Sequence, residues 1–312
     1  MEVSQTKKEA PMKGNSLLAK FFTGDVKKKL QNVRTTSGFT IEDVVRSGTE
    51  NPDSSIGVYA PDEESYKVFG ALFNPVIEEY HGHTEDDFHK NNFNADELDI
   101  SNPDEEGAFI VSTRVRVGRN LKDFPFNPGI SRKERLEVER RVVEALESLE
   151  GDLSGKYYPL SGMKEEVREQ LVEDHFLFKQ GDRFLESAGV NHDWPEGRGI
   201  FHSDDKKFLV WVNEEDQLRI ISMEQGGDIY SVFNRLARAV SALEKKLEFA
   251  CSEKLGYLSS CPTNLGTAMR ASVHMSLPKL SQRDGFKEMC EEMGLSCSRN
   301  SWRALRERGW SI

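Results

Sequence analysis

An acidic stretch without a repeating apolar pattern divides this chain into two parts that are expected to fold differently. Residues 81–107 contain nine acidic side chains and one basic side chain, Lys90, and the stretch runs into Asn102-Pro103. A segment rich in Asn and Asp with so few apolar residues is typical of a linker rather than of a packed element. The 312-residue chain is therefore predicted to form two domains, one on each side of this linker.

Helical spacing characterises the residues before the linker. Apolar side chains recur near a period of 3.6 residues at Leu18, Phe21, Phe22, Val26 and Leu30. A second helix is expected to start after the capping residue Thr40 and to stop at Gly48. A third is expected to open at Asp62 and to break at Pro75. We therefore predict a small all-helical N-terminal domain.

Alternating polar and apolar residues appear only after the linker. Strands are predicted at Ser112–Val117, Phe208–Val212, Leu218–Met223 and Ala271–Leu277. Long helices are predicted after the capping box of Ser131 and Glu134 and from Asp228 onward. The polar residues 213–217 between two of the strands indicate a hairpin. Strands and helices together predict a larger α/β or α+β domain.

The net charge of −11 argues against a nucleic-acid partner, which usually meets a basic surface. The linker alone carries −8 (one base against nine acids), so the remaining surface has room for a cationic pocket. The longest strongly apolar run is Phe208–Val212, too short to cross a bilayer, and the first residues have no apolar signal core. We therefore expect a cytoplasmic protein without a membrane partner.

Arginines are the main candidates for binding an anion. The glycine-rich phosphate loops of nucleotide-binding proteins are absent from the sequence, so side chains would have to hold any phosphate. Arg114 and Arg116 are two residues apart on a predicted strand and share one face, and Arg270, Ser272 and His274 share a face by the same rule. Such a set would form a polydentate anion site. Solvated or ion-paired arginines on an exposed sheet face remain the alternative.

An acidic run, a cysteine and three histidines are further candidates for catalytic or metal-binding residues. The acidic run of residues 214–216, beside Arg219, would supply a general base, an anchor for a cationic substrate or a Mg²⁺ ligand, or only a polar turn. Cys261 lies nine residues before Arg270 and would be either a thiolate of lowered pKa or a small buried hydrophobe. His81, His83 and His89 are interpreted as solvated linker residues, with metal binding as the weaker alternative.

These features together resemble the phosphagen (ATP:guanidino) kinases, and within them the arginine kinases most. The matching segments are Ser112–Arg116, Trp194–Ile200, Val210–Asp216, and Cys261–His274 with its Cys-Pro-Thr-Asn-Leu-Gly-Thr run. The resemblance implies an α+β fold, in which a small helical domain precedes a larger domain whose antiparallel sheet is flanked by helices. It also implies reversible transfer of the γ-phosphoryl group of MgATP to a guanidino nitrogen.

The resemblance implies a role for each matching residue. Arginines that grip the ATP phosphates are expected at Arg114, Arg116, Arg219 and Arg270. Contacts on the adenine and ribose side are expected from His175 and His274. Glu215 would align the guanidinium and accept its proton, and Cys261 would pack against that guanidinium without acting as a covalent nucleophile. ATP or ADP and Mg²⁺ are the expected cofactors, and no metal site made by the protein itself is expected.

Substrate choice is expected to lie in the specificity loop, residues 53–62, which resembles the short loop of arginine kinases. The amino-acid end of arginine would be held by Ser54, Ser55, Ile56, Gly57, Val58 and Tyr59. Ser55 stands where glycine is common in that family, and a positive φ there would strain it. Asp53 is expected to bridge the two domains to Arg183. Taurocyamine, glycocyamine and creatine remain alternative substrates, and either a monomer or a homodimer is compatible with the sequence.

The resemblance implies where each domain begins and ends and where the similarity to the family stops. We expect an extension over residues 1–16, the helical specificity domain over 17–83, the linker over 84–107 and the ATP-binding domain over 108–295. After Leu295 the similarity ends, and residues 296–312 read as an unrelated tail instead of the family's second glutamate loop. An incomplete domain with an exposed sheet edge is therefore expected. A catalytically impaired isoform that at most binds nucleotide remains the alternative function.

Overall fold

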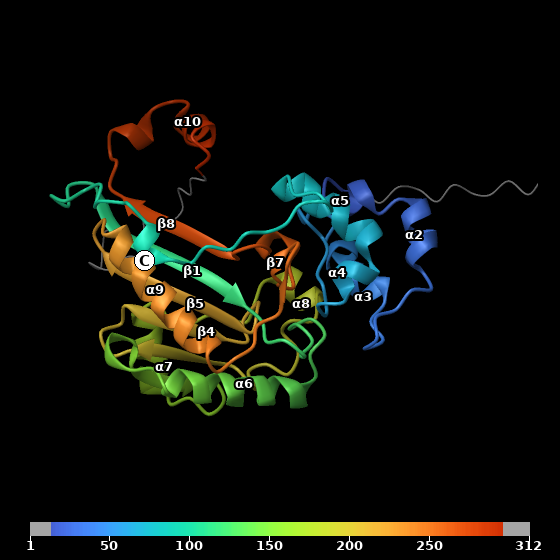
Figure 1. The fold of residues 1–312 in the computed structure, drawn as a ribbon, viewed down its shortest axis with the longest axis horizontal. Helices are drawn as coiled ribbons and strands as arrows, with labels where there is room; N and C mark the ends of the chain where they lie inside the picture. The colour runs from blue at the N-terminus through green and yellow to red at the C-terminus, as the bar shows by residue number, and fades with distance from the viewer. Residues whose placement is uncertain (1–13, 296–312) are drawn as a thin grey trace, which may run out of the picture.

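The computed structural model describes residues 14–295 as a helical domain and a sheet domain joined by an extended segment (Figure 1). The predicted tail at 296–312 and most of the predicted extension lie outside the described residues. The helices of the first domain are α1 (Leu17–Phe21), α2 (Gly24–Leu30), α3 (Ile41–Glu50), α4 (Ser65–Val68) and α5 (Gly70–His81). The predicted all-helical domain is therefore confirmed.

Two predicted helix boundaries in this domain are wrong. Thr40 and Asp43 form the expected cap of α3, but the helix continues past Gly48 to Glu50. Gly48 is needed inside α3 because a Cβ there would lie 2.5 Å from the Cα of Gly57. Helix α5 also continues through Pro75, since packing of its buried face outweighs the one hydrogen bond that proline removes.

The chain between the two domains is largely exposed to solvent but is anchored to the second domain at several points. The Nε2 atoms of His81 and His83 lie 2.8 Å and 2.7 Å from the carbonyl oxygens of Pro262 and Lys254. The backbone N–H of His89 donates to the carbonyl oxygen of Glu253 at 3.0 Å. His81 is solvent-exposed as interpreted, whereas His83 and His89 are half-buried. This segment, which includes the 3-10 turn η1 (Ala95–Glu97), is fastened to the second domain.

The second domain is built on one antiparallel sheet. Its six strands are β1 (Ile110–Arg119), β2 (Gly155–Pro159), β3 (Gly199–Ser203), β4 (Phe208–Val212), β5 (Leu218–Gln225) and β8 (Met269–Met275), in the order β2-β3-β4-β5-β1-β8. A two-stranded ribbon of β6 (Cys251–Ser252) and β7 (Gly256–Tyr257) lies beside it. The predicted hairpin is confirmed as the β4–β5 pair. The α+β class with an antiparallel sheet is confirmed.

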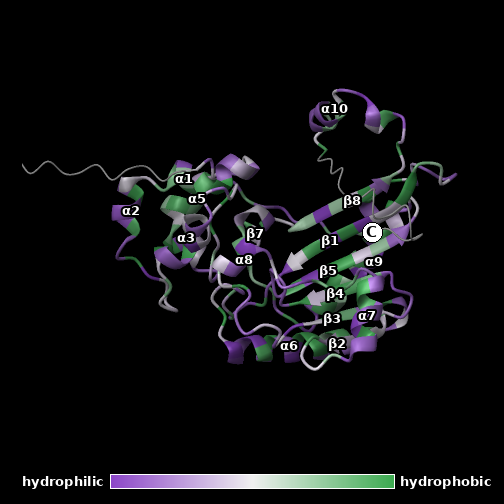
Figure 2. Cartoon of the chain, turned by 180° about the vertical axis from the view of Figure 1, so that it is seen from behind, coloured by the Kyte–Doolittle hydropathy of each residue, from purple (hydrophilic) through white to green (hydrophobic). Residues whose placement is uncertain are grey.

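Helices cover this sheet, and the capping residues that predicted two of them are confirmed. The helices of the second domain are α6 (Arg132–Glu147), α7 (Glu165–Glu173), α8 (Arg183–Ser187), α9 (Ile229–Glu244) and α10 (Phe286–Glu292). Ser131 and Glu134 form the capping box of α6, and the side chain of Asp228 caps α9. Helices α6 and α9 bury the apolar residues of one sheet face, where Val115 and Val117 of β1 lie. Figure 2 shows the central strands as mainly hydrophobic and α6 as alternating in hydropathy.

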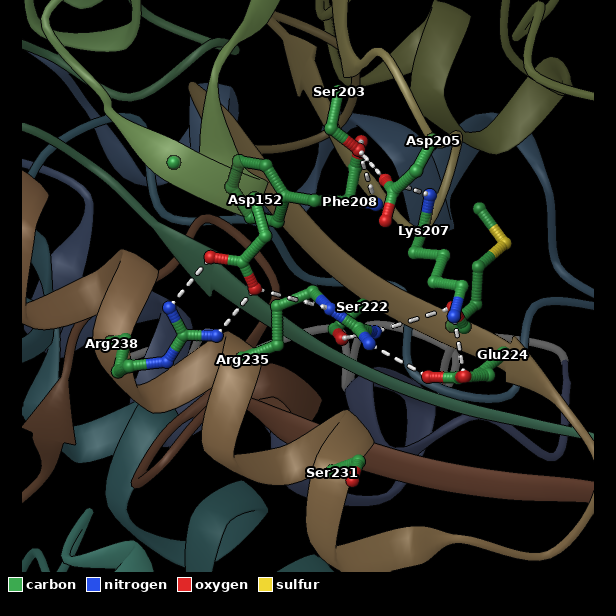
Figure 3. Close-up of polar contacts among 12 residues, drawn as sticks. Asp152, Ser203, Asp205, Lys207, Phe208, Ser222, Glu224, Ser231, Arg235 and Arg238 are labelled. Atoms are coloured by element: carbon green, nitrogen blue, oxygen red, sulfur yellow. Dashed lines mark hydrogen bonds and ion pairs between the residues drawn. The ribbon is translucent and has the colours of Figure 1, made fainter.

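A network of charged side chains holds α9 against the back of β5 (Figure 3). The buried guanidinium of Arg235 donates to the Ser222 hydroxyl at 3.1 Å and to the Glu224 carboxylate at 2.7 Å. Arg238, one turn along, binds both carboxylate oxygens of Asp152 at 2.8 Å and 2.6 Å. Because every charge has an opposite partner, this network is a structural clamp that fixes β5 from behind.

The opposite face of the sheet is apolar at one end and open at the other. Its buried cluster is made by Leu171, Phe176, Phe178, Ile200, Leu209, Ile221 and Met223. Strand β8 lies at the edge of the sheet, and its Met269 and Val273 are 41% and 40% exposed, which agrees with the expected exposed edge. No helix within residues 14–295 is long and apolar enough to span a bilayer.

Candidate active site

Four of the predicted anion-binding arginines come together on the open face of the sheet. The register pairs Arg116 of β1 with Arg270 of β8, and Gly118 of β1 with Arg219 of β5. Residues directly opposite each other in neighbouring strands share a face, so Arg114, two residues before Arg116, belongs to the same set. The sequence parity of Arg114 and Arg116 is therefore confirmed, with Val115 and Val117 in the core behind them. We call these four residues the arginine face.

The arginine face places four guanidinium groups close together, and Arg114 and Arg116 among them are partly buried. Burial lowers the pKa of Arg114 to about 10, and the neighbouring charge of Arg219 lowers it further. Burial also lowers the pKa of Arg116 to about 10, together with the charges of Arg219, Arg114 and Arg270. Repulsion from the neighbouring guanidinium groups disfavours the charged state of Arg114 and Arg116. A polyanion between them would relieve that repulsion, as expected for a phosphate site.

Carboxylates border the arginine face at the β4–β5 connection, residues 213–217, which we call the acid turn. Arg219 Nη2 lies 3.0 Å from Glu214 Oε2 and 2.8 Å from Glu215 Oε2. The other oxygen of Glu215 accepts a hydrogen bond from Asn264 Nδ2 at 3.2 Å. Burial raises the pKa of Glu214, and the charge of Glu215 adds to that rise, although Arg219 opposes it. The Glu215 carboxylate is thus held in a fixed orientation beside the cations.

The predicted thiol lies in a segment that reaches the acid turn, residues 258–264, which we call the thiol segment. Cys261 is a free, buried cysteine whose Sγ is 3.1 Å from Thr263 Oγ1. Burial raises the pKa of this thiol to about 12, and the nearby charge of Glu215 acts in the same direction. The alternative of a low-pKa thiolate is therefore wrong. Cys261 is a neutral thiol mainly because it is buried, and the negative charge of Glu215 further disfavours the thiolate.

The specificity loop is tied to the helices around it through its carbonyl groups. The carbonyl oxygens of Ser55 and Ile56 each accept a hydrogen bond at 3.0 Å from α1, and that of Gly57 accepts one at 3.1 Å from α3. Ser54 donates its backbone N–H to Asn51 at 3.0 Å, and Val58 is fully buried. Within the specificity loop, Gly57 has a positive φ of +82°, whereas Ser55 does not have a positive φ. The expected strain at Ser55 is therefore absent.

The end of the specificity loop meets the catalytic candidates. Burial raises the pKa of Tyr59, and the negative charge of Glu215 contributes to that rise. The backbone N–H of Ala60, the next residue, donates at 2.7 Å to the carbonyl oxygen of Ser260, which precedes Cys261. The predicted bridge between the domains is confirmed as an ion pair of Asp53 with Arg183. The loop of the helical domain and the acid turn of the sheet domain therefore face a common space.

The two predicted histidines lie away from the acid turn. His274 of β8 pairs in register with Ser112, and its Nδ1 atom lies 3.1 Å from the Ser112 hydroxyl. His175 is exposed directly after α7, next to Phe176, whose carbonyl oxygen accepts a hydrogen bond from Trp211 Nε1 at 2.8 Å. The strand partner of His274, Ser112, also pairs with Gln225 at the end of β5, whereas the acid turn precedes the start of that strand.

Sequence reasoning missed several residues that shape the site. The ring of Trp211 lies 6.0 Å from the guanidinium carbon of Arg114 and 5.4 Å from that of Arg219. Strand parity would have found it, because Trp211 is directly opposite Arg219. The amide of Asn264, which orients Glu215, carries no such signal because it lies in the short turn η3 (Pro262–Asn264).

The two-domain fold agrees with the comparison to protein families. Residues 12–78 match the N-terminal domain of the ATP:guanido phosphotransferases, and residues 137–299 match their C-terminal catalytic domain. The chain therefore belongs to the ATP:guanido phosphotransferase family.

Several individual members of this family are similar to the chain over most of its length. The chain is 55% identical over 278 residues to an arginine kinase of Anthopleura japonica, an alignment that covers 89% of this chain and 39% of that protein. It is 50% identical to Arginine kinase Lit v 2.0101 of Penaeus vannamei, with 95% and 83% covered. A solved substrate-free duplicated taurocyamine kinase from Schistosoma mansoni superimposes with a TM-score of 0.85 at 40% identity, with 94% of this chain and 43% of that chain covered.

Proposed function

We propose that this chain is a phosphagen kinase that transfers the γ-phosphoryl group of ATP reversibly to a guanidino nitrogen of L-arginine. The observation that carries the proposal is the meeting of the arginine face with Glu215, Cys261 and Tyr59, which come from both domains. The relatives named arginine kinase, at 55% and 50% identity, support arginine over the other guanidino compounds.

The nucleotide is assigned to the sheet. Phosphoryl transfer needs little covalent help from the protein and depends on charge neutralisation and alignment. The arginine face supplies the charge, with Arg116 nearest its centre because Arg114, Arg219 and Arg270 all act on it. We place the adenine and ribose toward His175 and His274, at the end of the sheet away from the acid turn.

The guanidinium of the substrate is assigned to the loops. Glu215 would hydrogen-bond the guanidinium, orient one nitrogen toward the γ-phosphorus and take the proton that this nitrogen releases as the new N–P bond forms and ADP leaves. The neutral Cys261 thiol would pack against the guanidinium, which needs no thiolate. Tyr59 and the backbone of residues 54–58 would hold the amino-acid end.

Mg²⁺ is expected to enter with the nucleotide. In residues 14–295 no group of three or more His, Cys, Asp or Glu side chains is arranged to hold a metal ion. The phosphate oxygens of ATP are therefore the expected ligands, and the ion would neutralise part of their charge when bound.

We also propose a cytoplasmic location for the protein. The helical domain over residues 17–83 is proposed as the specificity domain, and residues 108–295 are proposed as the nucleotide domain.

A phosphorus NMR assay tests the proposed function. The purified chain is mixed with MgATP and L-arginine, and the growth of a phosphoramidate signal is followed against Glu215→Gln as the control. We expect a signal with arginine that exceeds those with taurocyamine, glycocyamine and creatine. Turnover no higher than that of Glu215→Gln with all four acceptors would contradict the proposal. Retained MgADP binding in calorimetry under that outcome would identify a nucleotide-binding isoform instead.

A further inference from the structure

One buried carboxamide joins the two loops that carry the candidate catalytic residues. Asn120 directly follows β1, and its side chain is 1% exposed. Its Nδ2 atom donates to Asp216 Oδ1 at 2.9 Å and to the carbonyl oxygen of Leu258 at 3.1 Å, and its Oδ1 atom accepts from the backbone N–H of Gln217 at 2.9 Å. Both donors and the acceptor of this amide are therefore used.

The three partners of Asn120 belong to the acid turn and to the thiol segment. Asp216 and Gln217 directly follow Glu215, and Leu258 lies three residues before Cys261. A second bond closes the same junction, because the backbone N–H of Ser260 donates to Asp216 Oδ1 at 3.2 Å. Asp216 is buried, so its carboxyl group has these protein donors in place of water. Asn120 is thus one of the contacts that set the position of Glu215 relative to Cys261, beside the Ser260–Asp216 and Asn264–Glu215 hydrogen bonds.

The same junction reaches the helical domain. The carbonyl oxygen of Ser260 accepts a hydrogen bond at 2.7 Å from the backbone N–H of Ala60, the residue after Tyr59. The Tyr66 hydroxyl donates to the carbonyl oxygen of Ser259, also at 2.7 Å. The thiol segment is therefore held by the helical domain on one side and by Asn120 on the other, which leaves it little freedom to move independently of the acid turn.

We propose that Asn120 is a positioning residue for the phosphoryl transfer proposed above: by tying the acid turn to the thiol segment, it fixes the spacing between the Glu215 carboxylate and the Cys261 thiol. This inference rests on the proposed function. Asn120 contacts neither group directly and lies behind them, so it acts through their backbones. A displacement of about 1 Å in a catalytic group can reduce the rate on the order of a hundredfold.

A purely structural role for Asn120 is the competing explanation, and kinetics separate the two. Asn120→Ala and Asn120→Ser are compared with Asn191→Ala. Asn191 is a matched buried asparagine, 7% exposed, whose Oδ1 atom accepts from the Gly181 N–H at 3.3 Å, away from the acid turn. We expect kcat to fall about tenfold to a hundredfold in the Asn120 variants, with the KM for ATP changed less than about threefold, and both values retained by Asn191→Ala.

Labelling of Cys261 provides a readout that does not need activity. The folded proteins are treated with iodoacetamide, and the modified Cys261 peptide is quantified by mass spectrometry. We expect Asn120→Ala to label at least about tenfold faster than the wild type, because the thiol segment loses its tie, and Asn191→Ala to stay within about threefold. Asn120→Ser is used where the alanine variant does not fold, since it keeps a hydroxyl donor.

The outcomes of the two readouts are distinguishable. Folded Asn120 variants that keep the wild-type kcat, or that label at Cys261 no faster than Asn191→Ala, would overturn the positioning role. A wild-type chain without phosphoryl transfer to any guanidino compound would instead overturn the proposed function. In that case the labelling comparison still decides whether Asn120 ties the two loops together.

Discussion

The two halves of the site are built in different ways. The phosphate half stands on strands, where the pairing of β1 with β5 and β8 brings the arginine face together. The guanidino half stands on the acid turn, the thiol segment and the specificity loop, which come from three separate parts of the chain. Backbone hydrogen bonds of the sheet fix the first half, whereas the side-chain amides of the buried Asn120 and the half-buried Asn264 fix the second.

This difference teaches where each half is vulnerable. Strand positions are held by many ladder hydrogen bonds, so replacing an arginine removes its charge and leaves its neighbours in place. The loops are held by a few buried polar contacts, and loss of one leaves unsatisfied groups that cost about 1–3 kcal/mol each. Substitutions in the phosphate half should therefore change binding and rate without unfolding, and those in the guanidino half should combine both effects.

The largest effect is expected from Arg116→Ala. Its guanidinium is in electrostatic contact with the other three members of the arginine face. A single arginine on a transferring phosphoryl group can be worth on the order of 10³-fold or more in rate, so we expect kcat/KM to fall by about that factor. Steady-state kinetics measure it, with the exposed Arg140→Ala of α6 as a control that keeps wild-type activity. A loss below about tenfold would break the assignment of the phosphates to this face.

Glu215→Gln should have the next largest effect, in the other half of the site. The amide keeps the shape of the side chain but can no longer take a proton, and general-base catalysis is typically worth about 10²–10⁴-fold. We expect kcat to fall within that range. Because the substitution also removes one anionic partner of Arg219, nucleotide affinity should not weaken. A variant that loses nucleotide affinity as strongly as it loses kcat would contradict the assignment of the nucleotide and the guanidinium to separate halves of the site.

A smaller but diagnostic effect is expected in the pH dependence of Cys261. Burial and the charge of Glu215 raise the pKa of this thiol to about 12. The fraction of reactive thiolate is therefore small at neutral pH and rises about tenfold for each unit of pH. The alkylation rate should rise about a hundredfold between pH 8 and pH 10. The exposed Cys251 in the same digest serves as an internal reference and should react faster throughout. A plateau in the Cys261 rate below pH 9 would contradict a neutral thiol.

The smallest effects are expected in the specificity loop, and they are effects on stability. Gly57 has a φ of +82°, and a Cβ there would lie 3.0 Å from Leu18 Cβ, so Gly57→Ala should lower the free energy of unfolding by about 1–3 kcal/mol. Ser55→Gly should lower it by less than about 1 kcal/mol, because only backbone entropy changes. Chemical denaturation of the two variants measures both values. An increase in the free energy of unfolding for Ser55→Gly would instead show that Ser55 is a strained position.

The sequence was most informative where one local rule decides the structure. Parity along a strand predicts that Arg114 and Arg116 share a face, and the capping residues Thr40 and Ser131 predict the starts of α3 and α6. The predicted break at Pro75 failed because packing across the helical domain outweighs a local preference.

The guanidino half was less accessible to sequence reasoning. The contacts of Asn120 span 96 residues to the acid turn and 138 residues to Leu258, and no local pattern marks an asparagine as buried. The thiol of Cys261 was assigned two opposite ionisation states for the same reason, since its pKa depends on Glu215, which only the fold brings near. Resemblance to a known family identified Glu215 and Cys261 but not Asn120, whose contacts only the structure shows.

Calorimetry of MgADP binding tests the division of the site most directly. The account predicts that Arg116→Ala binds at least about tenfold more weakly than the wild-type chain, while Glu215→Gln binds as tightly as the wild type or more tightly. Equal loss of affinity in both variants, or a loss confined to Glu215→Gln, would contradict the placement of the phosphates on the sheet and of the guanidinium on the loops.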